Sequence, residues 1–171
     1  NQISVLPEGI FDNLSNLQSL DLDNNQISVL PEGIFDNLSN LQRLCLDNNQ
    51  ISVLPEGIFD NLTNLQSLYL YDNQISVLPE GIFDNLTGLR NLELYRNQIS
   101  WSLDVLCDLT GLQYLSISYN HFSGPIPACF FDFEDLRRWG WMIDYNYLSL
   151  DWLTSEQEEF LNTYFYYEGD M

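Results

Sequence analysis

The side chains that could perform chemistry in this sequence are acids, a single histidine and three cysteines. Adjacent carboxylates, such as Glu134 with Asp135 and Glu158 with Glu159, are a residue type that general acid–base catalysis uses. Adjacency alone is weak evidence for catalysis, and the histidine, His121, fits a turn or surface position. The sequence has no nucleophile–base constellation, no phosphate-cradling glycine loop and no metal-ligand cluster. We therefore expect no enzyme, no metal site and no cofactor.

The charge of the chain excludes further classes of function. Its 25 Asp and Glu residues stand against 5 arginines and no lysine, which gives a net charge of −20. Such a surface repels phosphate backbones and anionic lipids, so we expect no nucleic-acid partner. No segment approaches the roughly 20 continuous apolar residues of a spanning helix, so we expect no membrane insertion. A chain of 171 residues that is 45% apolar suffices for one folded domain.

The elements that must position these side chains come from a repeat. Across the first four copies of the unit NQISVLPEGIFDNLSNLQSLDLDN, 17 of 24 positions are identical. Near-identical copies occupy 1–24, 25–48, 49–72 and 73–96, degenerate copies occupy 97–119 and 120–145, and a distinct segment occupies 146–171. One unit cannot close a hydrophobic core, whereas stacked units share one. We therefore predict a single solenoid domain over 1–145.

The spacing of apolar residues within the unit follows the pattern LxxLxLxxNxIxxLPxGIFxxLxxL. Across the first and second units it is carried by Leu17, Leu20, Leu22, Asn25, Ile27, Leu30, Pro31, Ile34, Phe35, Leu38 and Leu41. This pattern resembles the leucine-rich repeat family, in the 24-residue type of extracellular receptors, and residues 120–127 resemble the plant type. The resemblance implies an α/β solenoid, a curved stack with one short strand per unit and a parallel sheet on its concave face. It also implies an extracellular or cell-surface location.

Residues that recur at equivalent positions of each unit are assigned to the strand, to a ladder and to an apolar spine. Leu20 and Leu22 alternate with Asp21 and Asp23, which is the period of a half-buried strand. A ladder that satisfies buried backbone groups is expected from Asn25, Asn49, Asn73, Asn97 and Asn120. An apolar spine is expected from Phe11, Phe35, Phe59, Phe83, Leu106 and Phe131, each phenylalanine in the first four units following a turn at Gly9, Gly33, Gly57 or Gly81.

The two ends of the stack differ. Ser155 with Glu158 matches a capping box, and Phe160, Leu161, Tyr164 and Phe165 share one helical face, so we predict a C-terminal helical cap over 146–171. At the other end Ile3, Leu6, Ile10 and Leu14 are expected to leave an open apolar edge. Repeats missing from this chain, or a partner, would cover that edge.

The positions that vary between the first four units indicate where a ligand binds. Five of the seven variable positions fall in the strand segment and are expected to point away from the core. Exposed positions elsewhere, such as Gln2 and Glu8, recur unchanged, which favours a diversified binding face over drift. The expected ligand-binding residues of this concave face are Asp21, Asp23, Arg43, Cys45, Asp47, Tyr69, Tyr71, Asp72, Glu93, Tyr95, Arg96, Tyr114 and Tyr119.

These residues divide into two groups by type. Asp21, Asp23 and Asp47 predict an acidic patch toward the N-terminal half. An aromatic patch toward the C-terminal half is predicted from Tyr69, Tyr71, Tyr95, Arg96, Tyr114 and Tyr119. The two patches predict a concave surface of two chemical characters.

The recurring acids and the cysteines leave alternatives open. The Glu8 and Asp12 columns are interpreted as a solvated acidic ridge, with bound calcium as the alternative there or at Asp21, Asp23 and Asp47. Cys45 is expected to be an exposed thiol, either a reactive group or one more variant. Cys107 and Cys129 lie on successive coils, where they form either a disulfide or two buried free thiols.

Together these observations predict a non-enzymatic recognition module that binds a macromolecule on its concave sheet. We expect a protein ligand, with a glycan as the alternative that tyrosines also suit. Two other functions remain open at this point. One is a structural or cell-surface scaffold without a discrete ligand, and the other is the regulatory repeat domain of a larger receptor or enzyme. The oligomeric state is not determined by the sequence.

Overall fold

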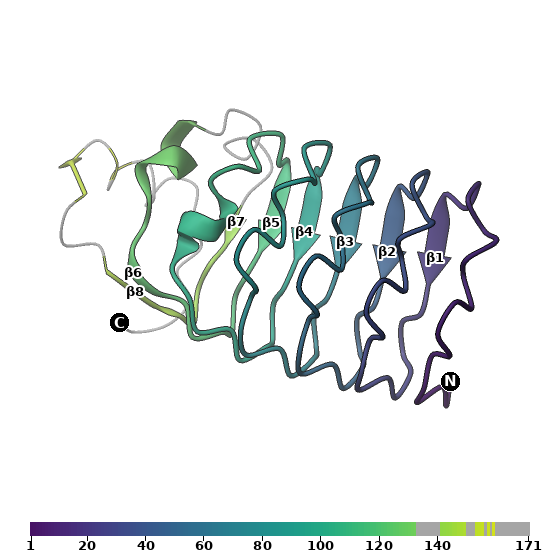
Figure 1. The fold of residues 1–171 in the computed structure, drawn as a ribbon. Helices are drawn as coiled ribbons and strands as arrows, with labels where there is room; N and C mark the ends of the chain where they lie inside the picture. Colours follow the sequence, from purple (N-terminus) through teal and green to yellow (C-terminus); the bar gives the residue numbers. More distant parts are fainter. Residues whose placement is uncertain (133–140, 150–152, 156, 158, 160–171) are drawn as a thin grey trace.

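The computed structural model of this chain describes residues 1–132, 141–149, 153–155, 157 and 159. Over these residues the chain winds into a stack of coils, each adding one short strand to a parallel sheet (Figure 1). In sheet order the strands are β1 (Ser19–Asp21), β2 (Arg43–Cys45), β3 (Ser67–Tyr69), β4 (Asn91–Glu93), β5 (Tyr114–Ser116) and β7 (Trp141–Met142). The predicted solenoid with a parallel sheet is confirmed.

Neighbouring strands pair at equivalent positions of successive repeat units. Leu20 of β1 pairs with Leu44 of β2, and Leu44 pairs with Leu68 of β3. Each central leucine from β2 to β5 is fully buried, while the residues on either side of it face outward or lie under outward-facing neighbours. Because equivalent residues pair directly, each variable column of the sequence becomes a row of adjacent side chains across the sheet.

The predicted asparagine ladder is confirmed. Asn73 donates from Nδ2 to the carbonyls of Leu46 and Leu70, at 3.0 and 3.1 Å, and its Oδ1 accepts from the Ile51 N–H at 2.9 Å. Asn25, Asn49, Asn97 and Asn120 make equivalent contacts. The ladder continues to Asn146, which was not predicted, because the sixth coil is longer and aligns poorly with the others.

An apolar spine runs through the stack as predicted. The rings of Phe11 and Phe35 stack with centroids 6.3 Å apart, and those of Phe35 and Phe59 stack at 6.5 Å. Phe83, Leu106 and Phe131 are buried in the same core. Burial of these large side chains against neighbouring coils supplies the main free energy that holds the coils together.

The N-terminal edge is largely open. Ile3, Ile10 and Leu14 are exposed by 42, 50 and 43%. Leu6 was expected to be exposed with them, and that prediction is wrong, because Leu6 is only 5% exposed and belongs to the core cluster. It occupies the same inward-facing place in its coil as the buried Leu30 of the next coil.

The turn before each spine phenylalanine needs glycine. Gly57 has a φ of +68°, and a Cβ on it would lie 3.0 Å from Oδ2 of Asp60. The other three turns have the same conformation and the same neighbouring aspartate, at Gly9, Gly33 and Gly81. The recurring aspartate column is thus packed over these turns.

One of the five variable columns lies in a left-handed turn, and its expected place in the strand is wrong. The strands have three residues each, and the last variable residue of each coil comes three residues after its strand. These residues have φ between 50 and 56°, and they are Asn24, Asn48, Asp72, Arg96, Tyr119 and Tyr145. The chain bends here because the ladder asparagine follows immediately. Asparagine and aspartate tolerate this conformation, whereas arginine and tyrosine are strained in it.

The C-terminal coils depart from the regular repeat. A second parallel sheet pairs β6 (Ser123–Pro125) with β8 (Tyr147–Ser149), within the repeat that resembles the plant type. Two 3-10 helices, η1 (Leu103–Leu106) and η2 (Ala128–Asp132), replace the turns of the earlier coils. In the part of the chain that the structure describes, no helix is long and apolar enough to cross a membrane.

Most of the predicted cap over 146–171 lies outside the described residues, including its apolar face from Phe160 to Phe165. The predicted capping box pairs Ser155 with Glu158, and Glu158 also lies outside the described residues. One residue earlier, Thr154 and Gln157 form a capping box: the Thr154 N–H donates to Gln157 Oε1 at 3.0 Å, and the Gln157 N–H donates to Thr154 Oγ1 at 3.3 Å. Ser155, the predicted cap residue, already has helical backbone.

Candidate ligand-binding surface

The expected binding residues lie on the outward side of the main sheet, which we call the sheet face: the exposed surface of β1 to β5 and of the residues that follow each strand. The register places Asp21, Cys45, Tyr69 and Glu93 in one row across four strands. A second row, two residues further along each coil, holds Asp23, Asp47, Tyr71 and Tyr95. The rows are held in line because backbone hydrogen bonds between coils continue past the strands, as from Leu46 N–H to the Tyr69 carbonyl at 2.9 Å.

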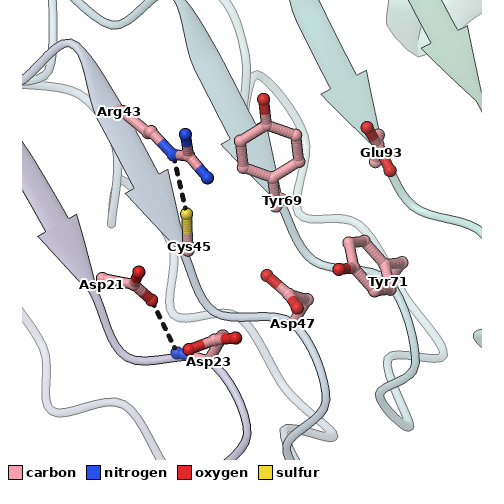
Figure 2. Close-up of a pocket in the computed structure, with 8 residues that line it drawn as sticks. All are labelled: Asp21, Asp23, Arg43, Cys45, Asp47, Tyr69, Tyr71 and Glu93. Carbon is pink, nitrogen blue, oxygen red and sulfur yellow. Dashed lines mark hydrogen bonds between the residues drawn. The ribbon is translucent and has the colours of Figure 1, made fainter.

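The two rows enclose a depression of about 200 Å³ in the sheet face (Figure 2). Four carboxylates, one guanidinium, one thiol and two phenols line it, and they belong to Asp21, Asp23, Asp47, Glu93, Arg43, Cys45, Tyr69 and Tyr71. We call this the central pocket. The carboxylates outnumber the one cation, so the pocket has a negative electrostatic potential.

Arg43 occupies one side of the central pocket. Its Nε donates to Cys45 Sγ at 3.1 Å, and its guanidinium lies 5.1 Å from the centre of the Tyr69 ring (Figure 2). The hydrogen bond to Cys45 raises the pKa of the arginine. Arg43 therefore stays charged and forms a cation–π contact on the sheet face.

Cys45 was expected to be an exposed thiol, and that prediction is wrong. It is only 3% exposed, because its short side chain sits in a row between Asp21 and Tyr69 and under Arg43. Burial raises the pKa of the thiol, and Arg43 opposes that rise in part. The thiol is therefore protonated at neutral pH, which does not suit a nucleophile.

Asp47 and Tyr71 join the acidic and the aromatic residues. Asp47 is 3% exposed although its column was expected to point away from the core, because neighbouring side chains of the sheet face cover it. Its carboxylate accepts a hydrogen bond from Asn48 Nδ2 at 2.9 Å, and the Tyr71 side chain lies beside it in the central pocket (Figure 2). Burial, and then the neighbouring Asp47 carboxylate, raise the pKa of Tyr71 above the ordinary tyrosine value.

Glu93 closes the central pocket on the side of β4. Burial raises its pKa, and the nearby charge of Asp47 raises it further. Glu93 also lines a second depression, of about 490 Å³, with Tyr69, Asn91, Gln113 and Tyr114. Since Tyr69 and Glu93 line both depressions, the two are neighbours, and together we call them the groove, which extends from β1 to β5.

Aromatic side chains continue along the edge of the groove. Tyr71 and Tyr95 stack with ring centres 4.5 Å apart and planes 7° from parallel. Tyr119 and Tyr145 stack at 4.1 Å, and Tyr119 and Tyr145 are about half exposed. Tyr145 is a surface residue that sequence reasoning missed, and its place immediately before the ladder residue Asn146 is the signal that identifies it.

Arg96 and Asp72 connect these stacks. The Arg96 guanidinium lies 5.9 Å from the centre of the Tyr119 ring, and its Nη1 lies 3.6 Å from Asp72 Oδ1. The Arg96 side chain is 61% exposed and that of Asp72 is 31% exposed, so solvent screens the ion pair and it stabilises the fold little. The ion pair instead orients the Arg96 guanidinium over the exposed ring of Tyr119.

The predicted division into two patches is only partly correct. The acids do lie toward the N-terminal coils and most of the tyrosines toward the C-terminal coils. However, they meet in the central pocket, whose lining contains Asp47, Tyr71 and Glu93. The sheet face is therefore one surface with a mixed centre.

The recurring acids form a separate surface away from the sheet face. Glu32, Glu56, Glu80, Asp60 and Asp84 line an open depression of about 560 Å³. Within the described ranges no group of three or more His, Cys, Asp or Glu side chains has the arrangement of a metal site. These columns therefore give no geometric support to the calcium alternative.

The two remaining cysteines join the fifth and sixth coils. Cys107 and Cys129 form a disulfide with their sulfurs 2.13 Å apart and their Cα atoms 5.7 Å apart. The bond ties η2 to the turn that follows η1, in the coils where the regular repeat is lost.

Comparisons with known proteins agree with this architecture. A family model described as a leucine-rich repeat region matches residues 1–152. A leucine-rich repeat protein of Leptospira interrogans is similar, with 29% identity, a TM-score of 0.77, and coverage of 95% of this chain and 38% of that one. The ectodomain of the receptor kinase SOBIR1 from Arabidopsis thaliana has 32% identity, a TM-score of 0.67, and coverage of 76 and 71%.

A third similar structure is the ectodomain of the Arabidopsis thaliana membrane receptor kinase GASSHO1/SCHENGEN3 in complex with Casparian strip integrity factor 2. It has 33% identity, a TM-score of 0.69, and coverage of 81% of this chain and 17% of that one. The chain thus spans well under two thirds of the length of the Leptospira protein and of this receptor. The search of curated proteins finds no match. The match over residues 1–152, together with the stacked coils and their parallel sheet, shows that the chain belongs to the leucine-rich repeat family.

Proposed function

We propose that this chain is a non-enzymatic recognition module that binds a protein ligand on its sheet face. The observation that carries the proposal is the distribution of variation among the first four units. Gln2, Ser4 and Glu8 recur unchanged in exposed positions, while the residues of the sheet face differ from coil to coil. Variation confined to one face is expected when that face is selected for binding.

The residue types on the sheet face support a protein ligand. Tyrosine and arginine are enriched where binding energy concentrates, because they bury a large area at a small cost in side-chain entropy. Four tyrosines and two arginines lie here in stacked or cation–π contacts that already fix their orientation, at Tyr69, Tyr71, Tyr95, Tyr119, Arg43 and Arg96. A preorganised surface loses little further entropy on binding.

Similar structures support the same class of ligand. The GASSHO1/SCHENGEN3 ectodomain was solved with Casparian strip integrity factor 2, and another similar structure is the complex of LRIM1 with APL1C. These partners belong to those proteins. For this chain we take from them that a leucine-rich repeat stack of this kind can hold a protein or peptide.

The proposal includes an architecture and a location. The solenoid is curved, with the sheet on the concave side, and it extends past the expected boundary at 145, because Asn146 continues the ladder and β8 pairs with β6. A helical cap covers its C-terminal end within 150–171. The location is extracellular or at the cell surface. The Cys107–Cys129 disulfide supports that location, because disulfides persist in oxidising compartments. Similar receptor ectodomains support it as well.

The test replaces the aromatic part of the sheet face and compares the proteins bound. Tyr69, Tyr71, Tyr95 and Arg96 are changed to serine together, and circular dichroism verifies that the variant folds. The matched control changes Val29, Val53 and Val77 to serine, because these exposed valines recur unchanged outside the sheet face. We expect loss of partners from the first variant and their retention by the second.

The same experiment distinguishes the alternatives. Unchanged partners in the sheet-face variant would contradict the proposal and favour a scaffold without a discrete ligand. Recovery of a glycan in place of a protein would contradict the protein ligand but retain the surface.

A further inference from the structure

The two arginines on the sheet face indicate which chemical group this surface accommodates. The Arg43 guanidinium lies over Tyr69 in the central pocket, where Asp21 contributes to the raised pKa of the arginine. The Arg96 guanidinium lies over Tyr119 and pairs with Asp72. In both places a guanidinium lies on a tyrosine ring beside a carboxylate, so the chain itself fills two cation sites of one design.

A third arrangement of the same kind lies between these two and lacks a cation. Tyr71 and Tyr95 stack on each other, and Tyr71 shares the lining of the central pocket with the carboxylates of Asp47 and Glu93. Among the described residues the two cation–π contacts are those of Arg43 and Arg96, and the ion pair is that of Arg96 with Asp72. The carboxylate of Glu93 thus has no cationic partner within that part of the chain.

We propose that the central pocket, between Asp47, Tyr71 and Glu93, receives a lysine or arginine side chain of a basic protein segment. This inference rests on the proposed function and narrows it to the chemistry of the ligand. The pocket, at about 200 Å³, has room for a side chain and not for a folded domain. Its lining has four carboxylates against one guanidinium, which is complementary to a cation.

The charge of the whole chain favours the same partner. A net charge of −20 raises the local concentration of basic segments and accelerates their encounter with the sheet face. A neutral glycan could stack on Tyr71 and Tyr95, but it has no positive charge to pair with the carboxylates of Asp47 and Glu93. A basic segment uses both the rings and the acids.

The experiment pans a displayed library of random twelve-residue peptides against the chain. A second selection uses the variant in which Tyr69, Tyr71, Tyr95 and Arg96 are serine. We expect the peptides that only the unchanged chain retains to contain lysine or arginine at a recurring position. Replacing an arginine at that position by citrulline, its neutral analogue, is expected to weaken binding about tenfold or more.

Two single variants localise the effect. Glu93→Gln removes one charge at the pocket and is expected to weaken the selected basic peptide about fivefold. Glu56→Gln removes the same charge from an exposed position outside the sheet face and is expected to leave its affinity unchanged at physiological salt. Tyr71→Phe tests the pocket without altering any charge, since it removes only the hydroxyl that lines the pocket beside Asp47.

The outcomes separate this inference from the proposed function. Selected peptides that need the sheet face but lack basic residues, or that bind equally well with citrulline, would overturn the cation site and leave the proposed function standing. Equal weakening by Glu93→Gln and Glu56→Gln would assign the effect to net charge and also overturn the site. Peptides retained equally by both selections, or no enrichment over the serine variant, would contradict the proposed function itself.

Discussion

The asparagine ladder positions every residue of the sheet face, and Asn73→Ala tests it most sharply. Asn73 lies between the third and fourth coils and makes four hydrogen bonds, to Leu46, Leu70, Tyr71 and Ile51. It is only 8% exposed, so water cannot readily replace these bonds. The variant removes all four without changing the strands on either side.

The loss of stability depends on which backbone groups keep another hydrogen-bond partner once the Asn73 side chain is removed. The Leu46 carbonyl also accepts from Asn49 Nδ2, and the Leu70 carbonyl also accepts from Asn97 Nδ2. The fully buried Ile51 N–H has its partner only in Asn73 Oδ1 among the contacts of the described residues. One unpaired buried donor costs about 1–3 kcal/mol and the shared bonds add less, so we expect destabilisation of about 2–4 kcal/mol.

The assay is urea unfolding followed by circular dichroism, with Asn25→Ala as the matched control. Asn25 makes equivalent bonds to Leu22, Asp23 and Ile3, but at the open edge, where the Ile3 N–H is exposed to water. We expect the control to cost less than about 1 kcal/mol. Equal losses for the two variants would refute the reasoning, because burial of the freed groups would then not decide the cost.

Three further predictions concern the turns, the disulfide and the pH dependence. Gly57→Ala should lower stability by about 1–2 kcal/mol because its φ is +68°, whereas Gly88→Ala, with ordinary contacts and no positive φ, should change it little, as urea unfolding measures. Replacing Cys107 and Cys129 by serine opens a loop with a sequence separation of 22, which should cost about 3 kcal/mol in the same assay, and reductant should give an equal loss in the unchanged chain. Burial raises the pKa of Glu93 above 4.5, so this carboxyl disfavours folding at neutral pH and ceases to do so as the pH falls through its raised pKa. Glu93→Gln should therefore raise the thermal midpoint at pH 7 and leave it unchanged at pH 4; an equal effect at both values would contradict the raised pKa.

The repeated parts of the structure could be predicted because identical units must occupy equivalent places. The strand of each coil, the asparagine ladder and the spine from Phe11 to Phe83 all follow from spacing in the sequence. A shared core gives each position the same environment in every coil, apart from the ends. The exposure of Ile3 follows from the same reasoning, because its equivalent in the next coil, Ile27, is buried between two coils.

The sheet face could be located from the sequence, but its contacts could not. Whether Cys45 is exposed depends on the conformation of Arg43, which lies over it, and the column alone does not determine that conformation. The approach of Tyr71 to Asp47 in the central pocket likewise depends on side chains of neighbouring coils. The surface position of Tyr145 and the cap at Thr154 could not be predicted either. Both lie where the repeat length changes, so their positions could not be aligned with those of the regular coils.

The central claim, that the sheet face binds the protein ligand, is tested most directly by photo-crosslinking. A photoreactive phenylalanine analogue replaces Tyr95 on the sheet face in one protein and the exposed Val53 outside it in the other. Both proteins are irradiated in the presence of their partners and the crosslinked products are compared by mass. The account predicts a crosslinked partner from position 95 and none from position 53. A partner crosslinked equally from both positions, or only from position 53, would contradict it.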